Sequence, residues 1–229
     1  MGKGVPMKRS ALLAVVLALT ACGSDNKATD EFSVFRKLAE GGLSVLKPKP
    51  PGDATIGLDR ARIDSIGLPL LKVDVEKRGA VAVLGLLAQS NGTQTWVTAD
   101  GITLTLRDGM IIASRGLGDD LMSAAVPASA TIARGTGSVE RRHYYLFGGE
   151  IETLAPFTCA LASKGRETLV VYSLSYAVTH VTEACAGTSD GAAVSFTNEY
   201  WIEGSGKIRQ SRQWLGAGVG FLDLTEINR

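Results

Sequence analysis

Three Asx-Gly pairs, Asn91-Gly92, Asp100-Gly101 and Asp108-Gly109, limit what this chain can fold into more than any other feature of its sequence. Such pairs favour the two-residue turns that join neighbouring antiparallel strands. The segments around them are rich in β-branched and apolar residues, which strands favour. We therefore expect an antiparallel meander, with strands at 81–88, 93–98, 102–106 and 110–114.

Alternation of apolar and polar residues extends the strand pattern to both sides of this meander. Leu71, Val73 and Val75 alternate with charged residues, as in a half-buried strand. Further strands are expected at 138–147, 155–163, 167–175, 178–184, 193–202, 207–215 and 221–224. Helical patterns are limited to 31–40, 58–65 and a single turn at 118–124. The predicted fold class is mainly β: one large, curved antiparallel meander sheet, an open or half barrel, with two or three short helices.

The N-terminus resembles a bacterial lipoprotein signal. Lys8 and Arg9 precede an apolar run, and Leu19-Thr20-Ala21-Cys22 at its end is similar to a lipobox. One alternative is a membrane-spanning anchor, but the apolar run has only about half of the ~20 residues that a span needs. A second alternative is an ordinary signal that happens to precede a free cysteine. We expect cleavage before Cys22 and attachment of lipid, palmitate included, to Cys22.

This signal divides the chain into a signal peptide at 1–21, a lipidated Cys22 with a polar tether up to residue 30, and a single mainly-β domain at 31–229. Two or more acyl chains make anchoring to a membrane stable. Gly23 stands where an aspartate would favour retention in the inner membrane, by analogy with sorting in enteric-type bacteria. The expected location is therefore the periplasmic face of the outer membrane. Met1 and Met7 both fit as the start of the signal.

Charge argues against nucleic acid as a partner. Removing the signal takes away three of the 24 basic residues and none of the 23 acidic ones, which leaves a formal charge of −2. A nucleic-acid-binding protein normally carries a basic patch or stripe, and this chain shows none.

Two cysteines remain after lipidation of Cys22, namely Cys159 and Cys185. In an oxidising compartment such a pair is best explained by a disulfide. Closing a loop of about 27 residues stabilises a fold by roughly 3–4 kcal/mol on the chain-entropy model. A metal site is the alternative, but it lacks the further cysteine or histidine at ligand spacing.

Residues that could carry catalysis form no recognisable constellation. The two histidines, His143 and His180, lie in strand patterns and are more simply packed or solvated strand residues. Asp119 and Asp120 are neighbours, and neighbouring carboxylates do not easily flank one glycosidic bond at the ~5–10 Å that such chemistry needs. We expect a protein that is not an enzyme and that uses no cofactor or metal.

Two polar clusters, at 105–120 and 209–214, stand out from the alternating pattern. A polar run within a strand means that both of its faces meet water or polar partners. Fork-like donors beside a flat apolar ring suit carbohydrate. The alternative is an internal network, for example Arg115 or Arg212 with Asp120. The candidate binding surface consists of Arg115, Asp120, Arg212, Gln213 and Trp214.

Four segments, 96–101, 104–109, 114–122 and 211–214, resemble the YjbF/GfcB family of outer-membrane lipoproteins. The most specific part is the Arg-Gly-Leu-Gly-x-Asp-Leu pattern that begins at Arg115, and the likeness runs from about residue 70 to the C-terminus. The resemblance implies a role in the production and export of exopolysaccharide or group 4 capsule. It also implies a largely β architecture, and it brings no catalytic residues to this chain.

The predicted function is that of a lipid-anchored periplasmic accessory protein, which assists production or export of a surface polysaccharide by binding the glycan or an outer-membrane export protein. One alternative is a half-barrel carrier of a lipid or lipid-linked sugar, which requires an apolar cavity of about a few hundred Å³. A less favoured alternative is a polysaccharide-modifying enzyme, which requires two carboxylates that converge across a cleft.

Overall fold

The computed structural model of the protein describes residues 31–40, 47–48, 57–147 and 151–228. The signal peptide, Cys22 and the tether lie outside the described residues. Within the described ranges, no helix is both long enough and apolar enough to cross a membrane.

The first half of the barrel is the expected meander. Its strands are β2 (Leu70–Val75), β3 (Ala80–Ser90), β4 (Thr93–Val97), β5 (Thr103–Arg107) and β6 (Met110–Arg115), each antiparallel to the next. Asn91 and Asp108 have φ of 47° and 48°, and Gly92 and Gly109 have φ of 76° and 84°. Two consecutive residues with positive φ are what a two-residue hairpin turn requires. The predictions from Asn91-Gly92 and Asp108-Gly109 are therefore confirmed.

The second half continues in the same up-and-down manner. Its strands are β7 (Leu121–Ala125), β8 (Thr136–Phe147), β9 (Ile151–Val171), β10 (Leu174–Ser189), β11 (Ala192–Glu203), β12 (Ile208–Gly216) and β13 (Gly220–Glu226). Each pairs antiparallel with the next. A short β1 (Lys47–Pro48) pairs with β3, and a 3-10 turn, η1 (Glu76–Arg78), joins β2 to β3.

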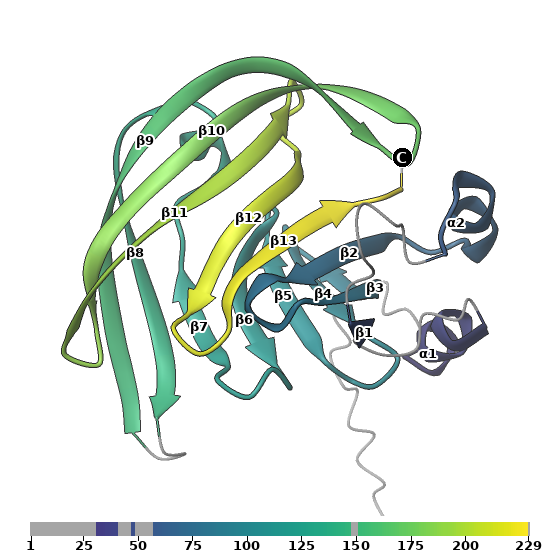
Figure 1. Cartoon of the computed structure of the whole chain (residues 1–229), viewed down its shortest axis with the longest axis horizontal. Coiled ribbons are helices and arrows are strands. Elements are labelled where there is room, and N and C mark those ends of the chain that lie inside the picture. Colours follow the sequence, from purple (N-terminus) through teal and green to yellow (C-terminus); the bar gives the residue numbers. More distant parts are fainter. Residues whose placement is uncertain (1–30, 41–46, 49–56, 148–150, 229) are drawn as a thin grey trace, which may run out of the picture.

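The last strand returns to the first, so the sheet curves into a nearly closed barrel (Figure 1). β13 pairs antiparallel with β2, and the strand order runs β6-β5-β4-β3-β2-β13-β12-β11-β10-β9-β8-β7. The two strands at the ends of this order, β6 and β7, face each other across a seam. The predicted fold class, a curved antiparallel meander with two or three short helices, is confirmed.

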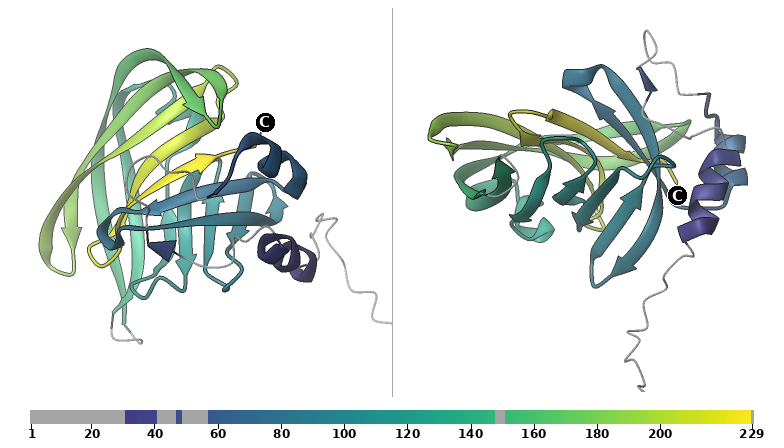
Figure 2. Two further views of the ribbon diagram at one scale, coloured as in Figure 1. Left: turned by 45° about the vertical axis from the view of Figure 1, so that its right-hand side comes forward. Right: turned by 90° about the horizontal axis from the view of Figure 1, so that it is seen from below.

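Two short helices lie outside the barrel, next to the end of the chain (Figures 1 and 2). They are α1 (Glu31–Glu40) and α2 (Arg60–Ile66). Val34, Leu38 and Ile63 are fully buried in a hydrophobic cluster that also contains Val83 of β3. The neighbouring Ala82 and Leu84 belong to the cluster inside the barrel, so the two faces of β3 serve two different cores.

Two expectations about local structure were wrong. The predicted helical turn at 118–124 is instead strand β7, because Leu121–Ala125 pairs with β8. The two strands expected at 155–163 and 167–175 belong mainly to one strand, β9, in which a register shift opposite Gly165 accommodates the expected break. A third short helix, α3 (Ser129–Ile132), lies between β7 and β8, and its Ile132 is fully buried.

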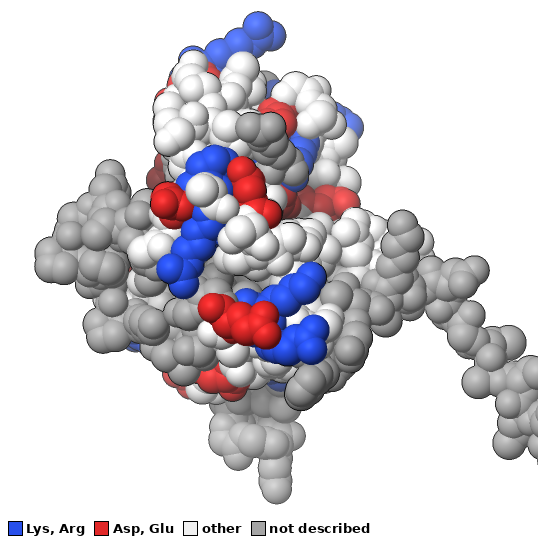
Figure 3. All heavy atoms as spheres, turned by 90° about the vertical axis from the view of Figure 1, so that its right-hand side faces the viewer, with Lys and Arg blue, Asp and Glu red and all other residues white. Residues whose placement is uncertain are grey.

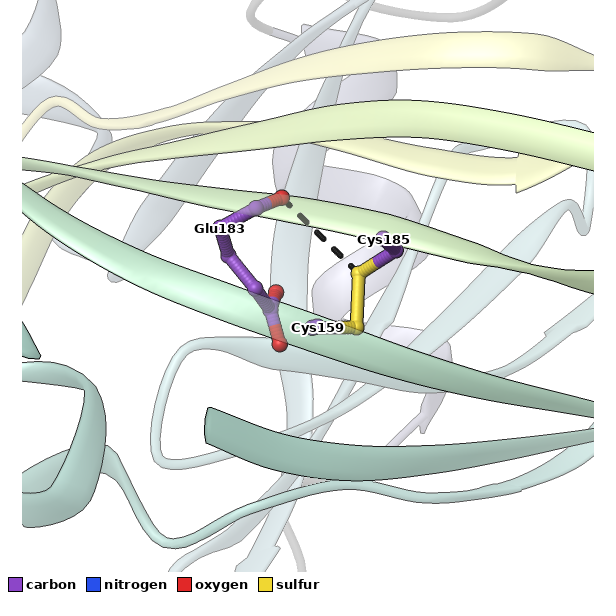
Figure 4. Close-up of side chains that lie close together, drawn as sticks. All are labelled: Cys159, Glu183 and Cys185. Atoms are coloured by element: carbon purple, nitrogen blue, oxygen red, sulfur yellow. Dashed lines mark hydrogen bonds between the residues drawn. A yellow bond between two sulfur atoms is a disulfide. The ribbon is translucent and has the colours of Figure 1, made fainter. Parts of the chain in front are cut away.

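The disulfide predicted from the cysteine count joins Cys159 to Cys185 (Figure 4). The two residues lie directly opposite each other on β9 and β10, and both side chains are buried inside the barrel. Because the two bonded residues are direct cross-strand partners, the covalent link fixes the register of the two longest strands.

Candidate functional site

Arg115 and Asp120, two of the predicted binding residues, close the seam between β6 and β7. The carboxylate of Asp120 accepts hydrogen bonds from Ser114 Oγ at 2.7 Å and from the backbone N–H groups of Gly116 and Leu117 at 2.8 and 3.1 Å. The guanidinium of Arg115 donates to the carbonyl oxygen of Leu121 on β7 at 3.1 Å. Side chains thus join the two ends of the strand order, and the segment that begins at Arg115 with the Arg-Gly-Leu-Gly-x-Asp-Leu pattern forms the seam.

Arg212 lies on β12, half-buried, and pairs with Glu76 rather than with Asp120. Its Nε and terminal nitrogen donate to the two carboxylate oxygens of Glu76 at 2.6 and 2.8 Å. Its guanidinium also lies 3.5 Å from the ring centre of Phe221. The contact ties η1 to β12 and β13, which is a structural role.

Gln213 and Trp214 are buried, with 2% and 9% of their surface exposed. Trp214 stacks on Phe196 with ring centres 4.5 Å apart, and it packs against Phe157 and His143 inside the barrel. The five residues expected to form one surface are therefore divided between the seam, a surface ion pair and the core. The internal-network alternative describes their contacts better, although the pairs differ from those expected.

A charged network that sequence reasoning missed lies in the barrel interior. Arg141 donates from Nε to Glu183 at 2.7 Å and from a terminal nitrogen to the hydroxyl of Tyr200 at 2.5 Å. The second oxygen of Glu183 accepts from Tyr200 and from Asn198, both at 2.9 Å. All four side chains are at most 2% exposed. Burial raises the pKa of Tyr200 well above its ordinary value, so Tyr200 stays a hydroxyl donor.

Glu183 also lies beside the disulfide, as Figure 4 shows. Its carboxylate and the sulfur atoms of Cys159 and Cys185 lie within 4.8 Å of one another. Three such groups could hold a metal, but both sulfur atoms are bonded to each other and offer no thiolate. This cluster is therefore a structural one.

One segment has the spacing of a hydrolase nucleophile, Gly187-Thr-Ser-Asp-Gly191. A nucleophile elbow holds its serine on a sharp turn between a strand and a helix. Here Ser189 ends β10, and Asp190 and Gly191 form the turn into β11. A strand-turn-strand arrangement does not supply the elbow geometry, so this serine is not a candidate nucleophile.

A cleft of about 690 Å³ with both polar and apolar walls lies at one mouth of the barrel. We call it the mouth cleft. Its walls come from the start of β2, the end of β13, α3 and three hairpin turns, namely β3–β4, β5–β6 and β11–β12. The β3–β4 and β5–β6 turns approach each other closely, since a Cβ placed on Gly92 would lie 2.7 Å from Oδ1 of Asp108. Two of the Asx-Gly turns predicted from the sequence thus shape this cleft.

Polar side chains with spare hydrogen-bonding capacity line the mouth cleft. Gln89 and Gln94 are directly opposite each other on β3 and β4, so their side chains share a face. Within the described residues, neither carboxamide nor the carboxylate of Asp108 makes a side-chain hydrogen bond. By contrast, Lys207 and Glu226 on the same wall form an ion pair with each other.

Trp96 lines the inner part of the mouth cleft and is 2% exposed. Its indole Nε1–H is buried and has no acceptor among the described residues. A buried donor without a partner costs about 1–3 kcal/mol.

The mouth cleft was missed by sequence reasoning, although one signal was present. A two-residue turn at Asn91-Gly92 fixes the register of the hairpin and pairs residue 89 with residue 94, as observed. The pair of glutamines could have been placed on one face from that register alone. The contribution of the β11–β12 turn and of α3 could not, because it depends on closure of the barrel.

Within the described residues, the apolar cavity inside the barrel is far smaller than a lipid carrier requires. An apolar cavity between β2, β3, β5 and β13, lined by Val73, Leu84, Leu104 and Leu222 among others, measures about 10 Å³. That volume is about the size of one water probe and cannot hold an acyl chain.

The surface that carries the helices mixes charges of both signs (Figure 3). Arg36 pairs with Glu40 at 3.7 Å and Arg60 with Asp64 at 3.4 Å, in each case within one helix. The described residues of this face therefore form no basic patch of the kind that recognises nucleic acid.

Comparison with known proteins adds a family to this geometry. Residues 34–227 match the family described as "Group 4 capsule polysaccharide lipoprotein gfcB, YjbF". The chain is 27% identical over 216 residues to "Uncharacterized lipoprotein YjbF" of Escherichia coli (strain K12), which covers 92% of this chain and 93% of that protein. The crystal structure of the hypothetical lipoprotein YmcC from Escherichia coli (K12) superimposes with a TM-score of 0.65 at 18% identity, covering 74% of this chain and 88% of that one. The last likeness supports the fold alone.

Proposed function

Because the chain belongs to the YjbF family of group 4 capsule polysaccharide lipoproteins, we propose that it assists production or export of a surface polysaccharide by binding the glycan in the mouth cleft. The observation that carries this proposal is the set of unpaired polar groups on Gln89, Gln94 and Asp108 beside the buried indole of Trp96. Sugars present hydroxyl groups that both donate and accept hydrogen bonds. Carboxamides and carboxylates on a concave wall match that pattern.

The proposed location is the periplasmic face of the outer membrane. Support comes from the lipobox-like Leu19-Thr20-Ala21-Cys22 and from Gly23 after it, together with the lipoprotein description of the family. Cleavage of residues 1–21 and lipidation of Cys22 would hold the barrel on the membrane through the tether. A protein fixed there meets the polysaccharide, and an outer-membrane export protein that carries it, on the way to the surface.

The proposed activity is binding rather than catalysis. Two carboxylates, Asp108 and Glu226, do line the mouth cleft, as a polysaccharide-modifying enzyme would require. Glu226, however, is held by Lys207, and a general acid or base must be within hydrogen-bond reach of the atoms it serves. The ion pair favours a wall that contacts sugar over one that cleaves it.

The test is to measure binding of the mature lipid-anchored protein, in detergent micelles, to the extracellular polysaccharide of its own bacterium by calorimetry. The double variant Gln89→Ala/Gln94→Ala should bind about tenfold or more weakly, because each lost hydrogen bond is worth about 1 kcal/mol. Gln210→Ala is the matched control, since Gln210 lies on β12 outside the cleft lining. The same variants should be assayed for surface polysaccharide in cells that lack the chromosomal copy.

Three outcomes separate the proposal from its rivals. Cleft-dependent binding with loss of surface polysaccharide supports it. Capture of an outer-membrane export protein without any affinity for polysaccharide would make the chain an assembly factor and refute glycan binding. Shortened polysaccharide after incubation, absent with Asp108→Asn, would identify an enzyme instead.

A further inference from the structure

We infer that the mouth cleft selects uncharged sugars that carry hydroxyl and amide groups, and that it discriminates against acidic ones. This inference rests on the proposed function and names the class of glycan at the same site. It follows from the charges and the hydrogen-bonding groups that the lining residues present.

The charge of the cleft argues against an anionic ligand. Three charged residues, Asp108, Lys207 and Glu226, belong to the lining. Glu226 pairs with Lys207, so the only cation of the wall is already neutralised, and Asp108 leaves a formal charge of −1. A uronate, sulfate or phosphate group would meet this negative charge with no cation free to balance it.

The neutral groups of the cleft argue for an uncharged ligand that both donates and accepts. Gln89 and Gln94 each offer an NH₂ group that donates and a carbonyl oxygen that accepts, the complement of a sugar acetamido group. The exposed Asp108 adds an acceptor for sugar hydroxyl groups. A glycan with N-acetylated, uncharged residues would satisfy these three side chains.

The arrangement also predicts how selectivity can be inverted. Glu226→Gln removes the partner of Lys207 and leaves a free ammonium group on the wall, and Asp108→Asn removes the unpaired carboxylate. Asp108 has φ of 48°, a conformation that asparagine adopts readily, so the second change is compatible with the turn. Together the two substitutions change the formal charge of the lining from −1 to +1.

The experiment compares two defined probes, the trimer of N-acetylglucosamine and the trimer of galacturonic acid, by calorimetry at low salt. The wild-type protein should bind the N-acetylglucosamine trimer about tenfold or more tightly than the acidic trimer. The double variant Asp108→Asn/Glu226→Gln should bind the acidic trimer about tenfold more tightly than the wild type does, and added salt should reduce that gain. Adding Lys207→Ala should abolish the gain.

The matched control is Asp100→Asn/Asp190→Asn, which makes the same change of charge in two turns outside the cleft lining. It should leave both affinities unchanged. The inference is overturned if the wild type fails to bind the N-acetylglucosamine trimer, or binds the acidic trimer as tightly. It is also overturned if the control gains affinity like the cleft variant. The proposed function stands if one of these outcomes is observed while the wild type still binds its own polysaccharide through Gln89 and Gln94. If the wild type does not bind its own polysaccharide, the proposed function and the inference are both refuted.

Discussion

The carboxamide of Gln213 on β12 reaches across the barrel and donates from Nε2 to the carbonyl oxygen of Gly109 at 2.9 Å. Its Oε1 accepts from the backbone N–H of Ile111 at 3.0 Å. One side chain therefore bonds the last residue of the β5–β6 turn and the second residue of β6, at the edge of β6 that has no strand partner in the sheet order. The same turn carries Asp108 into the mouth cleft. A Cβ on Gly109 would lie 2.9 Å from the Cβ of Ile208, so the turn and β12 could not approach so closely with another residue there.

Replacing Gln213 with leucine should destabilise the protein by about 2–4 kcal/mol, because it leaves a buried N–H and a buried carbonyl oxygen without partners. The free energy of unfolding in urea measures the loss. Gln210→Leu on the same strand serves as control, since the side chain of Gln210 makes no hydrogen bond among the described residues. Equal losses in the two variants would show that the bridge to the turn contributes nothing.

Arg115→Ala should loosen the seam rather than remove a glycan contact. The variant loses the hydrogen bonds to the carbonyl oxygens of Leu121 and Met122, at 3.1 and 3.4 Å, and bonds to a charged donor are worth about 1.5–3 kcal/mol. Amide hydrogen exchange should accelerate in β6 and β7 before it does in β9 and β10. Arg107→Ala, at the exposed end of β5, is the control. Unchanged exchange at the seam, with weaker polysaccharide binding, would restore the surface role that the sequence suggested.

Local signals in the sequence were sufficient to predict the positions of most of the strands. Asx-Gly pairs and alternation located β3 to β6 within one to two residues of their observed ends, because turn geometry and burial act on neighbouring residues. The prediction of a helical turn at 118–124 was wrong because contacts with distant residues stabilise β7 as a strand. These contacts are the pairing with β8 and the hydrogen bond from Leu121 N to Ser114 Oγ at 3.0 Å. Such distant contacts leave no trace in a short window.

The site was harder to predict than the fold for the same reason. A run of polar residues at 209–213 correctly indicated that β12 meets polar partners on both faces, but not that those partners are the protein's own backbone and Glu76. Arg141 and Glu183 are 42 residues apart and meet only because both point into the closed barrel. Closure of the barrel pairs some polar side chains with each other, and only the remaining ones are available to a ligand.

Glu183→Gln should cost about 3–5 kcal/mol of stability, because it leaves the buried guanidinium of Arg141 without a counter-charge. The double variant Arg141→Met/Glu183→Leu should be less destabilised than this single variant, since no uncompensated charge remains inside the barrel. Urea unfolding of both variants measures the difference. Glu140→Gln is the control, because Glu140 pairs with Arg142 at 3.4 Å on the surface and its side chain is 74% exposed. A double variant that is less stable than Glu183→Gln would contradict this account of the pair.

His143 should make the protein less stable as the pH falls from about 6.5 to about 3. Burial, helped by the nearby charge of Arg141, lowers the pKa of His143 from 6.5 to about 3, so the folded state keeps this ring neutral. Tyr145 donates its hydroxyl proton to the carbonyl oxygen of Leu215 at 2.7 Å, and therefore accepts from Nδ1–H of His143 at 3.0 Å.

The direction in which stability changes with pH follows from the number of protons bound in the folded and unfolded states. Between these two pH values the unfolded chain protonates this histidine and the folded chain does not, so unfolding takes up a proton. The free energy of unfolding then falls by up to about 1.4 kcal/mol per pH unit as the pH decreases, and above pH 6.5 this contribution is constant.

His143→Phe keeps an aromatic ring against Trp214 and removes the titrating group. Its stability, measured by urea unfolding from pH 4 to pH 7.5, should depend less steeply on pH than that of the wild type by this amount. Parallel curves for the two proteins would mean that His143 is protonated inside the folded barrel.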